Sequence, residues 1–336
     1  MAPIRGFFVW GGGLLLVLVP FFLFVALGWP TSPDSCTNIK DGVQVIPYIE
    51  GTHDLDVKHP DTCYCEAFKV EDVNAGKPGI RQPTNTLSNF YAIFTSLGLV
   101  FWIRCDRKKV LNGEAELKNA FWDPDSWIPE VYVFAVLFLG LGSMFLHASL
   151  SSTVSWFDGM SMYVFTSFLP AYTLSRRLNL GWWFLAVYLG PAVLFTGLNV
   201  IPGMEDASTV LVAIIVAAYA ATELFVKGYD IHKLGGLFWG GWGPWFGRLA
   251  DGLFTSFWMW LPILFWSLGL GSFIAASKFR SASQTGFPMC HADSWFQPHG
   301  LLWHILSGVM AVMLYFYWRG LRDNEMRAIA ANASST

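Results

Sequence analysis

Three histidines lie at the ends of strongly hydrophobic segments, where an unpaired polar ring is energetically unfavourable. His147 closes the apolar run 137–146, and His299 and His304 open the run that follows Pro298. Imidazole is the commonest side-chain ligand for a metal, and ionisable groups at membrane depth usually have a function. A catalytic zinc ion needs three such neutral ligands and one open position. The sequence therefore predicts a zinc site formed by these three residues.

Two further polar residues can act beside such a site. Ser143 and His147 are four residues apart, so on a helix they share one face, and Asp158 follows across the short connection 149–155. Asp158 could accept and return a proton, and Ser143 could donate a hydrogen bond to a developing oxyanion. A serine or a single histidine in a membrane helix is also commonly a packing group. Five polar residues from three segments at one depth favour the catalytic interpretation.

The composition is that of an integral membrane protein. The chain is 54% hydrophobic, 17% aromatic and only 13% charged, with a mean hydropathy of +0.44. The first apolar stretch could be a cleaved secretory signal, but its length of about 22 residues favours an uncleaved signal-anchor. Eight stretches are long enough to cross about 30 Å of hydrocarbon: 7–28, 86–103, 128–147, 157–174, 181–200, 208–226, 253–276 and 299–318.

Basic residues orient these stretches. With both termini in the cytoplasm, 14 Lys and Arg fall on the cytoplasmic side and seven on the lumenal or exterior side, which satisfies the positive-inside rule. The predicted zinc site then faces the lumen or exterior. Glu223 precedes Lys227 by four residues, so we interpret this pair as a helix-surface ion pair with a snorkelling lysine.

Four cysteines fall on the predicted lumenal side, where disulfides persist. The long segment 30–84 contains six prolines and has no helical period, so we expect an irregular, disulfide-tied loop. We expect Cys290 to link this loop to the segment before the last span, although free thiols are the alternative. The disulfide candidates are Cys36, Cys63, Cys65 and Cys290.

Several segments resemble one known superfamily. GLGSMFLHASLSSTVSWFDGMSMY at 140–163 resembles the Ser-x3-His-x10-Asp signature of alkaline ceramidases, adiponectin receptors and Per-like hydrolases, the CREST superfamily. FQPHGLLWHILSG at 296–308 resembles its terminal paired-histidine signature, and IRQPTNTLSNFYAIFTSLGLVF at 80–101 resembles the opening of its first core helix. CYCE at 63–66 is similar to an amino-terminal ceramidase motif. The resemblance spans about 60–318.

The resemblance implies an all-α, polytopic membrane helix bundle with a seven-helix core and one extra amino-terminal transmembrane or signal-anchor helix. It implies zinc held by His147, His299 and His304, with Asp158 and Ser143 as catalytic groups. The expected divisions are a signal-anchor at 1–29, a lumenal loop at 30–84, the hydrolase core at 85–320 and a cytoplasmic tail at 321–336.

The histidine spacing departs from the superfamily pattern. The superfamily has His-x3-His, with the two residues four apart and one helical turn from each other. Here His304 follows His299 by five residues, and Gly300 stands where the first histidine of the pair is expected. On a regular helix the extra residue turns one ring away by about 100°. Both rings can reach one ion if His299 lies in a frayed first turn beside Pro298, or if a π-bulge absorbs the residue.

A second departure concerns calcium. Animal-type ceramidases carry an acidic calcium-binding cluster, of which only Glu66 stands at a matching place here. Cys63, Phe68 and Gln82 replace other oxygen ligands or change their charge. Since a hard cation needs several oxygen ligands, these replacements argue against calcium binding.

The expected function is zinc-dependent cleavage of the linear amide of a ceramide-like sphingolipid into a sphingoid base and a fatty acid. Expected partners are membrane lipids and no nucleic acid, and the expected location is the endoplasmic reticulum, Golgi or plasma membrane. A lipid esterase or phospholipase would use the same site. A lipid receptor or a GPI-lipid remodelling factor with a structural metal is the other alternative.

Overall fold

The structure is a computed structural model of the chain. It describes residues 2–29, 38–40, 43–45, 66, 78–178, 180–198, 210–223, 245–283, 289 and 294–321. These residues are helical except for short connections and one antiparallel hairpin, in which β1 (Asn38–Lys40) pairs with β2 (Val43–Val45). The predicted helical fold class is confirmed for this part of the chain. The hairpin lies in the segment where only irregular loop was expected.

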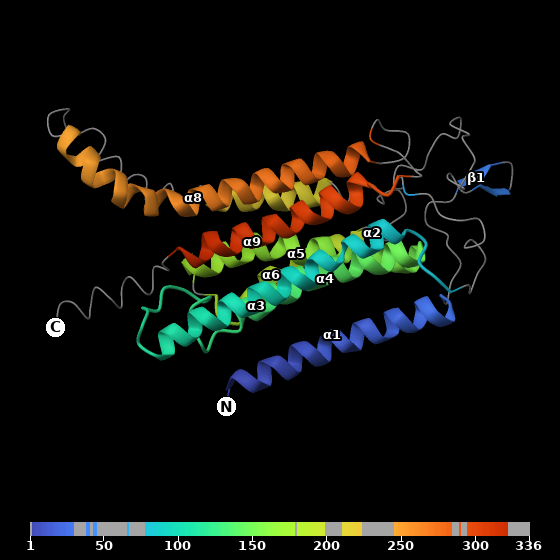
Figure 1. Cartoon of the computed structure of the whole chain (residues 1–336), viewed down its shortest axis with the longest axis horizontal. Helices are drawn as coiled ribbons and strands as arrows, with labels where there is room; N and C mark the ends of the chain where they lie inside the picture. Colours follow the sequence, from blue (N-terminus) through green and yellow to red (C-terminus); the bar gives the residue numbers. More distant parts are fainter. Residues whose placement is uncertain are drawn as a thin grey trace. The chain divides into compact units, whose positions relative to one another are not determined.

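Helices occupy all eight apolar stretches (Figure 1). Two of the helices begin with a short separate element, α2 before α3 and the π-helical turn η2 before α9. The bounds are α1 (Ala2–Leu27), α2 (Pro83–Ser88), α3 (Phe90–Leu111), α4 (Ile128–Ser149), α5 (Ser152–Leu178), α6 (Trp183–Leu198), Val210–Glu223, α8 (Trp245–Ala282), η2 (His299–Trp303) and α9 (His304–Arg319).

Three of the described helical segments are long and apolar enough to cross a membrane. They are Pro83–Leu111, Ile128–Ser149 and His299–Arg319. This agrees with the membrane protein that the composition indicates. The seven-helix core remains a prediction.

The chain divides into two compact units, and α3, α4, α5, α8 and α9 contribute to both. Unit 1 comprises Met1–Ile93, Phe138–Ser161 and Ala275–Leu306. Unit 2 comprises Phe94–Leu137, Met162–Ile274 and Ser307–Thr336. All five predicted zinc-site and catalytic residues fall in unit 1.

Small residues let the helices of unit 1 approach closely. A Cβ at Gly140 would lie 2.2 Å from the Cβ of Ala92, and one at Gly142 would lie 2.8 Å from the main-chain oxygen of Phe157. Close approach through glycine is a common way to pack membrane helices. It places the carboxyl-terminal half of α4, which carries Ser143 and His147, directly against α3 and α5.

α1 packs into unit 1 through its carboxyl-terminal end. Phe21 and Trp29 are each only 2% exposed, and the ring of Phe21 contacts that of Phe145 with centroids 5.2 Å apart. The Trp29 indole donates a hydrogen bond to the main-chain oxygen of Gly79 at 2.8 Å. The first helix therefore contacts the α4 turn that precedes His147.

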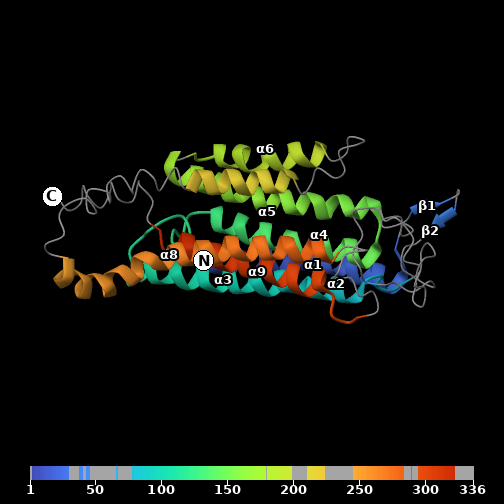
Figure 2. The same cartoon turned by 90° about the horizontal axis from the view of Figure 1, so that it is seen from above.

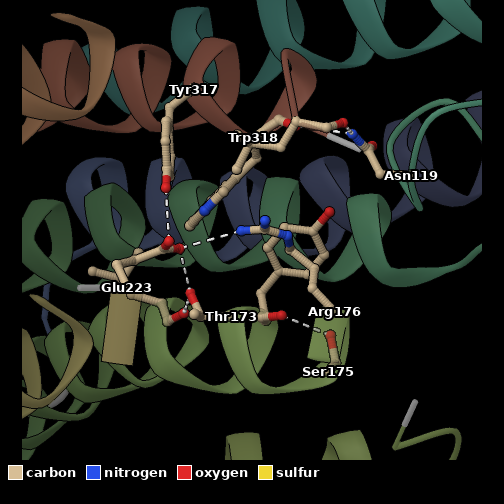
Figure 3. Close-up of polar contacts among 10 residues, drawn as sticks. Asn119, Thr173, Ser175, Arg176, Glu223, Tyr317 and Trp318 are labelled. Atoms are coloured by element: carbon tan, nitrogen blue, oxygen red, sulfur yellow. Dashed lines mark hydrogen bonds and ion pairs between the residues drawn. The ribbon is translucent and has the colours of Figure 1, made fainter. Parts of the chain in front are cut away.

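Unit 2 has an aromatic core and a buried charge. Figure 2 shows α6 and the helix Val210–Glu223 beside α5, which agrees with the ring contact between Phe168 and Phe184. Trp318 is fully buried, and its ring stacks on that of Phe121. The Asn119 amide donates to the main-chain oxygen of Trp318 at 2.9 Å (Figure 3).

Glu223 is the buried acid of this unit (Figure 3). Its carboxylate accepts hydrogen bonds from the hydroxyls of Thr173 at 2.6 Å and Tyr317 at 2.7 Å and from the Arg176 guanidinium at 3.3 Å. The residue is 2% exposed, so its interpretation as a helix-surface pair was wrong; Lys227 lies outside the described residues. Helical spacing alone could not reveal donors that come from α5 and α9.

Glu223→Gln should strongly destabilise the protein. Removing the carboxylate charge of a buried pair takes it away from the Arg176 guanidinium, at a cost of about 3–5 kcal/mol. Glu130→Gln is the matched control, because Glu130 also pairs with an arginine but its side chain is 43% exposed. That change should cost under about 1 kcal/mol. Thermal unfolding in detergent measures both; equal shifts would contradict the assignment of a buried, essential pair.

Candidate metal centre

The three predicted histidines meet in unit 1. Their nearest ring nitrogens all lie within 4.8 Å of one another, and Nε2 of His147 is 3.1 Å from Nε2 of His299. All three residues are at most 3% exposed. At zinc–nitrogen distances of about 2.0–2.1 Å, tetrahedral donors stand about 3.3 Å apart. Small side-chain movements would therefore let these residues bind one metal ion.

A π-helical turn brings His299 and His304 together. η2 spans His299–Trp303, directly before α9 begins at His304. A π-helix bonds residue i to residue i+5, so a pair five apart comes close to one face, as a pair four apart does in an α-helix. The two ring centroids are 4.9 Å apart. Of the two expected arrangements, the π-bulge is confirmed.

Gln82 orients the ring of His147. Its Oε1 lies 2.6 Å from Nδ1 of His147, while its Nε2 donates to the main-chain oxygen of Glu66 at 3.1 Å. Because the amide group uses its N–H toward Glu66, Oε1 must accept from Nδ1–H of the imidazole. Nε2 of His147 then carries the lone pair, as a metal ligand requires.

Ser88 does the same for His304. Its hydroxyl donates to the main-chain oxygen of Asn85 at 2.9 Å, so its oxygen accepts from Nδ1–H of His304 at 2.7 Å. The ring of Tyr91 stacks on that of His304, with centroids 5.9 Å apart and planes 18° from parallel. Hydrogen bonds of this kind fix the tautomer and orientation of metal-binding histidines.

Ser143 and Asp158 adjoin the three rings. The Ser143 oxygen is 3.2 Å from Nε2 of His304, accepts from the Asn89 amide at 3.2 Å, and hydrogen-bonds the Asp158 carboxylate. The positive charge of Arg280 acts on the same carboxylate. A hydroxyl, a carboxylate and three imidazoles thus form one group, which can hold a metal and transfer a proton beside it.

Gly300 permits the contact between α2 and η2, which lie side by side (Figure 1). A Cβ at this position would lie 2.7 Å from Oδ1 of Asn85, 3.0 Å from Oγ of Ser88 and 3.2 Å from the Asn85 Cα. Gly300 stands where the superfamily spacing would put a histidine. The packing against α2 requires a small residue at this position. It keeps Ser88 within reach of His304.

Glu66 does not fit a calcium site. Its two carboxylate oxygens accept main-chain N–H bonds from Thr84 at 2.7 Å and Asn85 at 2.8 Å, so they cap the first turn of α2. Burial raises the pKa of Glu66, against the opposing effect of the Asn85 and Thr84 N–H bonds. Calcium needs six to eight oxygen ligands, and the structure shows Glu66 serving as the cap of α2.

Sequence reasoning missed part of the site, and part lies outside the described residues. The hydrogen bond from His147 to Gln82 was not anticipated, nor was the ring of Tyr91 on His304. Pro83 is a signal for the start of a helix, and Gln82 directly precedes it. This position was the clue in the sequence that Gln82 lies at the beginning of α2. The four disulfide candidates Cys36, Cys63, Cys65 and Cys290 are not among the described residues.

Gly300→Ala should weaken metal binding. The added methyl group must push Asn85 and Ser88 away, and Asn85 meets it partly through its backbone, so α2 must shift and Ser88 loses His304. We expect at least about a 10-fold loss of metal affinity, as is found when a residue that hydrogen-bonds a metal-binding histidine is changed. Gly271→Ala on α8 is the control, since a Cβ there meets nothing within 4 Å. Competition with a metal-binding dye measures both, and equal affinities would contradict this role of Gly300.

Comparison with known proteins adds no family assignment: no protein-family model matches the chain, and no curated protein matches it significantly.

Proposed function

We propose that this protein is a zinc-dependent hydrolase that cleaves the amide bond of ceramide-like membrane lipids. The observation that carries the proposal is the buried group of three imidazoles with Asp158 and Ser143 beside it. A purely structural metal needs no carboxylate and hydroxyl next to its ligands. The resemblance to CREST signatures supplies the amide substrate.

His147, His299 and His304 would hold the ion. All three donors are nitrogen, and Gln82 and Ser88 keep two of the rings neutral with Nε2 available, which suits zinc. When bound, zinc supplies a Lewis acid that polarises the amide carbonyl and acidifies water.

The protein's own residues would handle the proton and the developing charge. Asp158 accepts a proton from the attacking water as the oxygen adds to the amide carbon. It returns that proton to the leaving nitrogen as the carbon–nitrogen bond breaks, so the products are a carboxylic acid and an amine. The Ser143 hydroxyl donates to the carbonyl oxygen as it becomes negative. Asn89, which donates to Ser143, keeps that hydroxyl in place.

We place the site on the lumenal or exterior side of an endoplasmic reticulum, Golgi or plasma membrane, with seven core helices around it. The bias of 14 to seven basic residues supports this orientation. The eight helices found at the eight apolar stretches support the bundle.

Detergent-purified protein should contain about one zinc per chain and release fatty acid from a labelled ceramide, with activity lost on chelation and restored by zinc. His304→Ala should lose both the metal and the hydrolysis, because one of three ligands is removed. His232→Ala is the matched control, since it lies in a predicted cytoplasmic segment. Phospholipids and ceramides are compared in the same assay. Preference for an ester substrate would indicate an esterase, and metal without turnover would exclude the hydrolase.

Asp158→Asn should separate catalysis from metal binding. The amide keeps the size of the side chain but cannot accept the proton, so turnover should fall by about 10²- to 10⁴-fold while bound zinc is unchanged. Turnover and metal content are measured on the same preparation. Wild-type turnover by this variant would remove Asp158 from the mechanism.

A further inference from the structure

Gln82 contacts His147 at two points. Its side chain accepts from Nδ1–H of the imidazole at 2.6 Å, and its main-chain N–H donates to the main-chain oxygen of His147 at 3.0 Å. Both residues are 1% exposed. The adjacent N–H of Arg81 also donates to the main chain of α4, at Ala148. The segment Arg81–Gln82 therefore binds both the last turn of α4 and the imidazole of His147.

Glu66 in turn holds Gln82. Its main-chain oxygen accepts a hydrogen bond from the side-chain amide of Gln82. Its carboxylate accepts hydrogen bonds from the main-chain N–H groups of Thr84 and Asn85 at the start of α2. The first N–H groups of a helix have no partner within the helix, so an external acceptor there fixes where α2 begins. The side chain of Asn85 also points an N–H at Oε1 of Gln82, at 3.4 Å.

Each of these oxygens already accepts an N–H bond from the protein. A calcium ion between Glu66 and Gln82 would have to compete with two main-chain N–H bonds and the bond from His147. An amide at position 82 is neutral, so it can be buried beside the imidazole without a counter-charge. The same local chain thus orients the histidine through hydrogen bonds alone.

We propose that Gln82 and Glu66 are positioning residues that hold the His147 ring ready for the metal and that they do so without calcium. This rests on the metal centre of the proposed function, and it is separable from the substrate. Gln82 sets the tautomer and angle of the ring, and Glu66 sets the position of Gln82.

The test is zinc affinity of the full-length protein in detergent, measured by competition with a chromophoric chelator. Gln82→Met removes the acceptor and should weaken zinc binding by about 10- to 100-fold. Gln82→Glu restores an acceptor for Nδ1–H and should bind zinc at least 10-fold better than the methionine variant. Glu66→Gln presents an N–H to the N–H groups of α2 and should weaken binding by about 10-fold. Thr196→Val is the control, since it removes a buried hydroxyl that donates within α6 to the main-chain oxygen of Ala192.

Calcium dependence is tested on the same wild-type preparation. A calcium-selective chelator, followed by calcium at millimolar concentration, should change neither zinc affinity nor ceramide hydrolysis by more than twofold. Loss and recovery of either with calcium would overturn the proposal.

The outcomes separate this inference from the proposed function. Wild-type zinc affinity in Gln82→Met, or equal affinities in the methionine and glutamate variants, would overturn the positioning role. The expected affinity series in a protein that hydrolyses no ceramide would uphold it and refute the hydrolase. Absence of zinc binding in the wild type would overturn both.

Discussion

The metal centre depends on one irregular turn of backbone. In a regular helix, His299 and His304 would face different directions, and His147 could meet only one of them. The π-helical turn at 299–303 changes that geometry at the start of α9 and brings both rings to the ring of His147. A π-turn gives poorer hydrogen bonding than an α-helix and is frequently found at functional sites. Neighbouring contacts must therefore hold it in place.

α2 provides those contacts. It lies against η2 at Gly300, where a side chain would push Asn85 and Ser88 away, and it carries Ser88 to His304. Its first turn is capped by Glu66 and preceded by Gln82, which reaches His147. A six-residue helix and the residue before it thus orient two of the three imidazoles, one on α4 and one on α9. The remaining groups, Ser143 and Asp158, come from the close packing of α4 and α5 at Gly142.

The sequence predicted the helices and the histidine group well, because both follow from short-range patterns. Apolar stretches of suitable length became helices, and Ser143 and His147 share a face because they are four apart on α4. For the backbone between His299 and His304, the sequence allowed two arrangements, a frayed first turn or a π-bulge. It could not decide between them, because the decision depends on packing against α2. Glu223 was misinterpreted for a related reason: Lys227 is near in sequence, whereas its true donors are 47 to 94 residues away. The role of Gln82 also depends on a distant partner, 65 residues along the chain.

The buried carboxylate of Glu223 constrains how the chain is assembled during synthesis. It lies in the apolar helical segment Val210–Glu223, and in lipid a carboxylate without donors is strongly disfavoured. Thr173 and Arg176 on α5 have already emerged from the ribosome when this helix is made, but Tyr317 on α9 comes almost a hundred residues later. Until α9 has been made, the Glu223 carboxylate of the nascent chain therefore lacks its hydrogen bond from Tyr317. A chain that stops before α9 would lack the Tyr317 donor, so this carboxylate would keep only its donors on α5.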